Sequence, residues 1–135
     1  MISSVILITS VIFIVIYYKP HRSVRHEEAA FTVTVSELVD AFRQDEMKAN
    51  SLYSGKVLEV EGALKEMILN DSTLILLMGD STRMMGVSCY LNKDQKDKYT
   101  SLTRGEWVKV KGICNGLLLD IVLDKCILLH ENNNE

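Results

Sequence analysis

The chain opens with a long apolar run before any alternating pattern begins. Residues 1–18 carry no charged side chain, and basic residues follow from Lys19 and Arg22. A helix of this length spans roughly 27 Å, close to the hydrocarbon thickness of a bilayer, about 30 Å. Tyr17 and Tyr18 lie where an aromatic belt would sit. The pattern predicts a single-pass transmembrane anchor over residues 1–18.

The alternative to an anchor is a cleaved signal peptide. Such a peptide needs a positive n-region and a small-x-small cleavage site, and the run has neither. The basic residues after the run favour a cytoplasmic domain under the positive-inside rule. Residues 19–31 are polar and contain the only Pro of the chain, so we expect them to form a short juxtamembrane tether.

Helical periodicity replaces the apolar run after the tether. Thr34 and Glu37 have the spacing of a capping box, in which each side chain accepts a hydrogen bond from a free backbone N–H. Apolar positions then recur at helical spacing, which predicts one amphipathic helix over residues 34–52. These positions are Val35, Leu38, Val39, Phe42 and Met47.

Beyond Gly55 the apolar residues alternate, and all seven Gly of the chain lie between Gly55 and Gly116. Gly62 interrupts the first alternating segment, where we expect a bulge or a bend. Asn115-Gly116 is typical of a two-residue hairpin turn. Asn92–Leu102 is polar and is expected to form a short helix. The predicted strands are Lys56–Lys65, Thr73–Met78, Met84–Leu91, Glu106–Ile113 and Leu117–Leu129.

Five short strands, a bent first strand and a helix between the third and fourth strands are the layout of an OB-fold barrel. The fold class is therefore all-β with an accessory helix. We expect the OB-fold domain to span residues 32–130, with the barrel over 55–129 and a polar tail over 131–135. Closing the sheet removes exposed edges, which explains how the apolar fifth strand stays soluble.

Several short sequence motifs resemble those of a known protein family. They are KPHR at 19–22, FTVTVSEL at 31–38, GKVLEVEG at 55–62, GVSC at 86–89, VKVKGICNG at 108–116 and LDIVLDKC at 119–126. With these motifs the chain resembles the tRNA-anti-like OB-fold family of small bacterial membrane-anchored or exported proteins. The resemblance implies an OB barrel behind an N-terminal anchor, an exported domain and no catalytic residue. The exported side implied here and the cytoplasmic side favoured by the charge rule both stay open.

The charge balance argues against a nucleic-acid ligand. The chain has 15 Lys and Arg against 18 Asp and Glu, and its formal charge is -3. Residues 31–135 hold 12 basic and 16 acidic side chains. A surface that is acidic overall attracts phosphates weakly, because phosphate contacts dominate nucleic-acid affinity.

The candidate ligand-binding residues combine an aromatic ring with cations. Trp107 shares one face of its strand with two lysines, an arrangement that can stack and hold a single nucleic-acid strand. The structural alternative is that Glu59 and Glu61 of the neighbouring strand pair with these lysines. The full set of candidates is Trp107, Lys109, Lys111, Asn115 and Tyr90.

The three cysteines allow two interpretations. In an OB barrel the third and fifth strands are parallel neighbours, so Cys89 and Cys126 should lie at one pole, with Cys114 at the other. In an oxidising compartment Cys89 and Cys126 are expected to form a disulfide. The alternative is three buried thiols acting as small hydrophobes.

Neither a metal nor a cofactor is expected. The three histidines, His21, His26 and His130, are scattered and form no ligand cluster with the cysteines. Asp120 and Asp124 lie on one strand face and are interpreted as solvated carboxylates. We therefore expect no enzymatic activity, and a third functional hypothesis is a small-molecule or redox role centred on Cys114.

The sequence predicts a membrane-anchored binding or scaffolding module. The expected ligand is a protein or a cell-envelope component, bound at the barrel face near the 69–73 and 114–117 loops. The alternative is an oligonucleotide-binding module, which the acidic charge disfavours.

Overall fold

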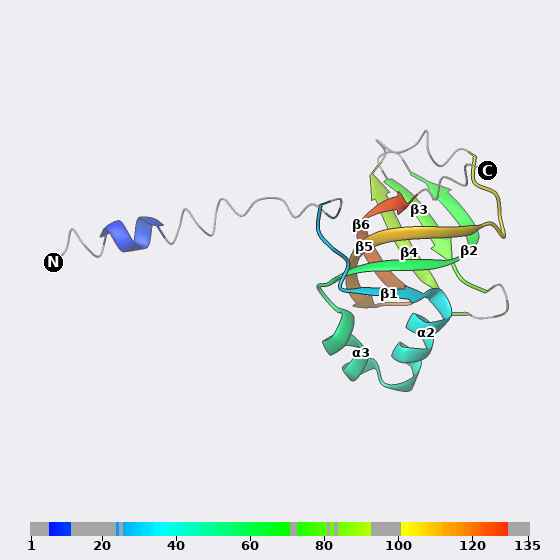
Figure 1. The fold of residues 1–135 in the computed structure, drawn as a ribbon, viewed down its shortest axis with the longest axis horizontal. Coiled ribbons are helices and arrows are strands. Elements are labelled where there is room, and N and C mark those ends of the chain that lie inside the picture. The colour runs from blue at the N-terminus through cyan, green and yellow to red at the C-terminus, as the bar shows by residue number, and fades with distance from the viewer. Residues whose placement is uncertain are drawn as a thin grey trace.

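The computed structural model describes residues 6–11, 24, 26–70, 73–80, 82, 84–92 and 101–129. Two helices and six strands follow residue 30 in this part of the chain (Figure 1). They are β1 (Phe31–Thr34), α2 (Val35–Gln44), α3 (Glu46–Tyr53), β2 (Val57–Leu69), β3 (Thr73–Met78), β4 (Val87–Asn92), β5 (Trp107–Leu117) and β6 (Ile121–Leu129).

Five of the strands close into a barrel. The order β2-β3-β4-β6-β5 is completed by antiparallel pairing of β5 with β2. β4 and β6 are the one parallel pair within this ring, with Val87 opposite Ile121 and Cys89 opposite Leu123. This arrangement confirms the predicted OB-fold barrel and its parallel third and fifth strands.

β2 is long enough to pair with both of its neighbours in the barrel, β5 and β3. Residues 57–63 pair with β5, and residues 64–69 pair with β3. The bulge between these two stretches lies between Leu64 and Glu66, and not at Gly62 as the sequence predicted. Gly62 has another role, because a Cβ built there would lie 2.6 Å from Cγ2 of Val35. It lets the first turn of α2 pack directly on the strand.

The N-terminal edge of the sheet holds a strand that the sequence pattern did not predict. β1 runs parallel to β2, with Phe31 opposite Leu58 and Thr34 opposite Glu61. The predicted tether therefore ends before Phe31. The Phe31 ring meets Tyr53 edge to face at 5.1 Å between ring centroids, which fixes β1 against the end of α3.

The predicted helix over 34–52 is two helices. The capping box is confirmed, since Thr34 Oγ1 accepts from Glu37 N–H and Glu37 Oε2 accepts from Thr34 N–H. The helix then breaks at Asp45, whose extended backbone ends α2 and whose Oδ1 accepts from Lys48 N–H to begin α3. The turn to a new helix axis also explains why Met47 is exposed and does not continue the apolar stripe.

α2 and α3 lie across one end of the barrel (Figure 1). The apolar stripe of α2 enters the same core as the inward residues of the strands. These helix residues are Val35, Leu38, Val39 and Phe42. The barrel end is therefore filled by side chains, as expected of a small closed barrel.

The Asn115-Gly116 hairpin prediction is wrong. β5 continues through both residues to Leu117, and the turn comprises residues 118–120. A register shift between Cys114 and Gly116 marks a bulge, and Gly116 has a φ of +90°. Asn115 and Gly116 therefore form a bulge that bends β5 and not a hairpin turn. Gly116 also leaves room for the Asn50 side chain of α3.

Part of the predicted 19–31 tether packs on the barrel. Val24 is only 4% exposed and lies with Val57 and Ile113 in a second apolar cluster on the outside of β2 and β5. Ala30 N–H donates to the carbonyl of Val57 at 2.8 Å. From Val24 onward the described residues belong to the folded domain.

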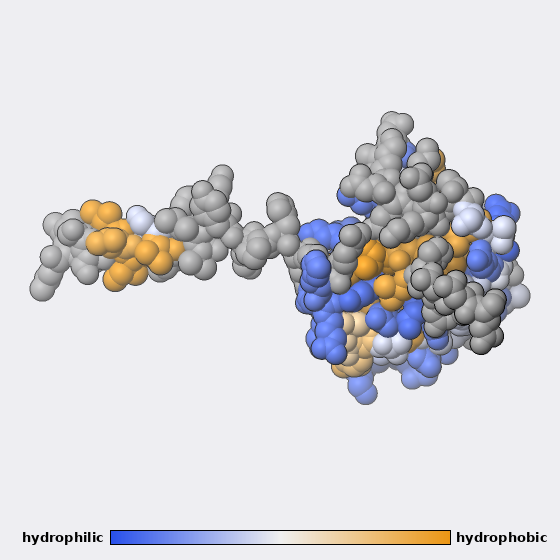
Figure 2. Space-filling view, turned by 45° about the horizontal axis from the view of Figure 1, so that its top comes forward, coloured by the Kyte–Doolittle hydropathy of each residue, from blue (hydrophilic) through white to orange (hydrophobic). Residues whose placement is uncertain are grey.

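Residues 6–11 form a short helical segment whose Ile6, Leu7, Ile8 and Val11 are exposed (Figure 2). Among the described residues, no helix is both long and apolar enough to cross a membrane. The rest of the predicted 1–18 anchor lies outside the described residues. Most of the predicted 92–102 helix and all of the 131–135 tail lie outside them too.

Candidate binding groove

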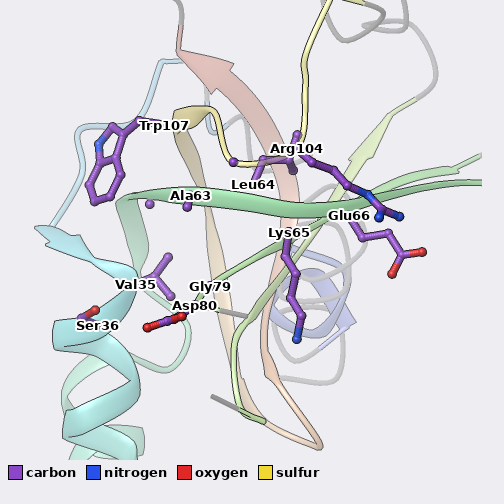
Figure 3. A pocket seen from close by; sticks show the side chains of 12 residues that line it. Val35, Ser36, Ala63, Leu64, Lys65, Glu66, Gly79, Asp80, Arg104 and Trp107 are labelled. Carbon is purple, nitrogen blue, oxygen red and sulfur yellow. The ribbon is translucent and has the colours of Figure 1, made fainter. Parts of the chain in front are cut away.

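An open groove of about 760 Å³ lies where β2 passes from one neighbouring strand to the other. Its walls are the first turn of α2, the middle of β2, the residues after β3 and the segment that enters β5 (Figure 3). The lining residues are Val35, Ser36, Gly62, Ala63, Leu64, Lys65, Glu66, Gly79, Asp80, Arg104, Gly105 and Trp107. We call this the β2 groove.

Trp107 is the dominant apolar group of the β2 groove. It is the first residue of β5, pairs with Ala63 of β2, and is 62% exposed. A small residue opposite Trp107 leaves the indole without a large cross-strand neighbour, so its ring stays available to a ligand. Trp107 is also the only tryptophan of the chain.

The segment entering β5 is held against β2 by its backbone. Gly105 N–H donates to the Leu64 carbonyl at 2.7 Å, and Leu64 N–H donates to the Glu106 carbonyl at 2.9 Å. Glu106 Oε2 in turn accepts from Thr103 N–H. These bonds fix Arg104 and Trp107 on the rim of the groove, so the rim is preorganised.

The charges lining the groove balance. Lys65 and Arg104 supply two cations, and Glu66 and Asp80 supply two carboxylates. Asp80 Oδ1 accepts from Thr82 N–H, which orients that carboxylate. The N-terminus of α2 adds little positive field, because its capping box already places the Glu37 carboxylate there. The groove is therefore a mixed-charge surface around an aromatic ring.

The floor of the groove depends on the absence of a side chain at Gly62. Gly62→Ala is expected to lower the free energy of unfolding by about 1–3 kcal/mol, because the added methyl overlaps Val35. Urea titration measures the loss. In a Val35→Ala background the same substitution is expected to cost less, since the overlapping methyls are gone. An equal cost in both backgrounds would contradict this explanation.

Of the five predicted ligand-binding residues, only Trp107 lines the β2 groove. Lys109 and Lys111 face outward further along β5, opposite Glu61 and Glu59 respectively. Lys109 Nζ lies 3.4 Å from Glu59 Oε2, which confirms the structural alternative of a Lys–Glu pair across these strands for that lysine.

Tyr90 and Asn115 lie away from the groove. Tyr90 is exposed on the outer face of β4, opposite Ile75 of β3. Asn115 is exposed near the C-terminal end of β5. Ligand contact was expected at the 69–73 and 114–117 segments, but residues 69, 70, 73 and 114–117, which the structure describes, are not part of the groove lining.

Sequence reasoning missed Lys65 and Arg104. Lys65 is the last residue of the predicted strand Lys56–Lys65, and Arg104 precedes the strand predicted from Glu106. The signal that could have identified both is the predicted barrel closure itself. The first barrel strand, β2, is bent and pairs with the fourth, β5. This pairing must place the middle of β2, with Lys65, next to the residues that lead into β5, which include Arg104.

Cys89 and Cys126 lie close together as predicted, but Cys114 is not at the opposite pole. Cys89 and Cys114 both pair with Leu123, from opposite sides of β6, so Cys114 lies at the level of Cys89 and not at the other pole. Cys126 is opposite Leu91. All three thiols are buried and free.

The thiols of Cys89 and Cys126 are hydrogen-bonded. Burial raises the pKa of Cys126 well above its ordinary value, and the Cys89 hydrogen bond adds to the increase. Burial also raises the pKa of Cys114, partly offset by a backbone hydrogen bond from Gly116. A raised pKa keeps a thiol protonated and unreactive, which argues against redox chemistry at Cys114.

Alkylation of the folded chain is expected to modify none of these thiols, and alkylation after unfolding without reductant should modify all three. Because burial in the folded state raises the pKa of Cys114 and Cys126 and so favours their neutral thiols, the free energy of unfolding should fall as pH rises above the ordinary thiol pKa. The slope is at most about 1.4 kcal/mol per pH unit for each thiol. Mass spectrometry reads the labels, and a single label after unfolding would establish the Cys89–Cys126 disulfide instead.

Metal binding finds no support in the part of the chain that the structure describes. No set of three His, Cys, Asp or Glu side chains in it is arranged to hold a metal ion. Asp120, interpreted from the sequence as solvated, is a structural acceptor. Its Oδ1 accepts from Gly86 N–H at 3.0 Å and its Oδ2 from the Ser88 hydroxyl at 3.3 Å.

The described residues form a closed OB barrel that carries an open groove. The model of the tRNA-anti-like family matches residues 1–128, and the chain belongs to this family. No curated protein matches the sequence.

Two solved structures share the fold. A "putative nucleic acid-binding lipoprotein" from Klebsiella pneumoniae is 18% identical, with a TM-score of 0.62 over 73% of this chain and 91% of that one. A "putative aspartyl-tRNA synthetase" from Leishmania major is 13% identical, with a TM-score of 0.53 over 84% of this chain and 23% of that one. At these identities the similarity extends to the fold alone.

Proposed function

We propose that this protein is a membrane-tethered, non-catalytic binding module whose β2 groove holds a segment of a protein partner. The observation that carries the proposal is that the exposed Trp107 lines the groove together with two cationic and two anionic side chains. Tryptophan is enriched among the residues that dominate protein–protein affinity. Two cations and two carboxylates around it suit a partner of mixed charge better than a polyanion.

An oligonucleotide is the second candidate ligand. It is favoured by Trp107 lying on the same rim as Arg104 and Lys65, because an aromatic ring beside cations is how OB-folds hold single strands. Three observations weigh against it. The chain carries a formal charge of -3, Glu66 and Asp80 share the groove, and Lys109 is paired with Glu59.

A photo-crosslinker at Ser36, an exposed lining residue, tests the ligand class in intact cells. Adducts that a protease digests and a nuclease leaves unchanged support the protein ligand. Nuclease-sensitive adducts establish the oligonucleotide instead. The same crosslinker at Tyr90, outside the groove, is the control and should give no equivalent adduct.

Trp107 fluorescence gives a second, independent test on the purified chain. Because no other tryptophan exists, any change in emission reports the groove directly. Titration with a 12-nucleotide oligothymidine at low salt should leave the emission unchanged if the groove takes a protein segment. A saturable change that weakens as salt rises would favour the oligonucleotide.

The membrane tether rests on the apolar run over residues 1–18 and on the family membership. We propose that this run anchors the chain as a single-pass segment. The side of the membrane that the barrel faces is decided by a topology reporter fused after Glu135. A reporter that is active only outside the cytoplasm would support the exported domain that the family resemblance implies. A reporter that is active only in the cytoplasm would support the orientation that the positive-inside rule favours.

A further inference from the structure

The turn between β5 and β6 displays apolar side chains where a soluble domain would place polar ones. Leu118 is 79% exposed and Leu119 is 92% exposed. Met84, on the loop between β3 and β4, is 99% exposed. Large apolar groups gathered on the surface mark interaction sites more often than isolated ones do. We call Leu118, Leu119 and Met84 the apolar tip.

Hydrogen bonds hold the two loops of the apolar tip together. Asp120 Oδ1 accepts from Gly86 N–H at 3.0 Å, and Ile121 N–H donates to the Gly86 carbonyl at 3.0 Å. Leu118 N–H donates to the Asp120 carbonyl, also at 3.0 Å, which closes the turn. The leucines therefore stand on a turn whose backbone is fixed to the start of β4.

The packing of Val24 limits how far the barrel can lie from the anchor. The apolar run ends at Tyr18, and Val24 is already buried against Val57 and Ile113. Six residue steps of extended chain reach at most about 22 Å. A domain on so short a connection stays next to the bilayer that holds the anchor.

The apolar tip lies within reach of that surface. Ile113, which contacts the same cluster as Val24, is five residues before Leu118 on β5 and its turn. Five strand residues cover roughly 17 Å, less than the maximum reach of the connection. Trp107 is at the opposite end of β5 from this turn, whereas Gly79 and Asp80 of the β2 groove begin the loop that carries Met84.

We propose that the apolar tip enters the surface of the membrane to which the chain is tethered, and so fixes the orientation of the barrel on the bilayer. This proposal rests on the membrane tether of the proposed function. Its ligand is a lipid surface, contacted through Leu118 and Leu119 with Met84 beside them.

The test uses the full chain in phosphatidylcholine vesicles. The native thiols are buried, so a cysteine introduced by Leu119→Cys is labelled selectively with an environment-sensitive fluorophore. Thr103→Cys, exposed in the segment leading to β5, is the matched control. We expect blue-shifted emission at position 119 and at least twofold stronger quenching by doxyl lipids than at position 103.

Three results would overturn the proposal. Equal emission and equal lipid quenching at both positions would show that the tip stays in water. Shielding from aqueous iodide without lipid quenching would assign the tip to a protein contact, such as a second copy of the chain. Failure of the chain to float with the vesicles would refute the tether itself, which distinguishes failure of the proposed function from failure of the tip.

Discussion

Leu123→Ala is expected to lower the free energy of unfolding by about 2–5 kcal/mol, because truncating a buried leucine removes packing and leaves a cavity. Leu123 has no exposed surface and pairs with Cys89 on one side and Cys114 on the other. Its side chain is therefore buried in the barrel interior, at the level where β6 pairs with both β4 and β5. Urea unfolding followed by circular dichroism measures the loss.

The matched control is the same substitution at an exposed leucine of the same hairpin. Leu119→Ala should change the free energy of unfolding by no more than about 0.5 kcal/mol, since Leu119 is 92% exposed. Comparable losses at the two positions would show that the interior of the barrel is not where the strand pairing places it. The comparison needs no knowledge of the ligand.

Trp107→Ala is expected to weaken ligand binding in the β2 groove by at least about 30-fold, the equivalent of roughly 2 kcal/mol for a central aromatic contact. The stability of the fold should change little, because Trp107 is 62% exposed and its partner is Ala63. The readout is the yield of adducts from a crosslinker at Ser36, compared with the chain that keeps Trp107.

Tyr90→Ala is the control for the groove. Tyr90 is also an exposed aromatic of a barrel strand, but it lies on β4, outside the groove lining. Its truncation should leave the adduct yield unchanged. A loss at Tyr90 with none at Trp107 would move the ligand to the outer face of β3 and β4.

The features predicted correctly from the sequence are those that local patterns specify. Thr34 and Glu37 form their capping box, and β3 begins and ends at the predicted residues. The parallel pairing of β4 with β6 follows from the OB layout once the strands are counted. For the capping box and β3, a short stretch of sequence holds the whole signal, whereas the parallel pairing requires the order of all five barrel strands.

The errors occur where a residue serves two elements or a distant partner. Thr34 ends β1 and also caps α2, so β1 was hidden by the helix signal. Asn115-Gly116 has the composition of a turn, yet its place opposite β6 makes it a bulge. Val24 is a single apolar residue among polar ones, and only the assembled barrel gives it a surface to pack on.

The candidate groove was predictable only in part, because some of its residues are marked by a local pattern and others are brought together by barrel closure. Trp107 was identified because an exposed aromatic beside lysines is visible in the strand pattern. Lys65 and Arg104 are far apart in sequence and meet only through the hydrogen bonds between Leu64 and residues 105–106. The contact depends on barrel closure, which composition and periodicity do not encode residue by residue.

The double pairing of β2 has a consequence for how the protein is made. Ala63 and Trp107 are register partners, so one edge of β2 stays open until roughly 45 more residues have been synthesised. At elongation rates of about 5–20 residues per second, that delay is several seconds. A nascent chain with an unpaired apolar strand for this time is prone to aggregate. Early docking of β1 on the other edge of β2, and of α2 on the strand, would cover part of β2 during this time, which gives the N-terminal elements a role during biosynthesis as well as in the finished fold.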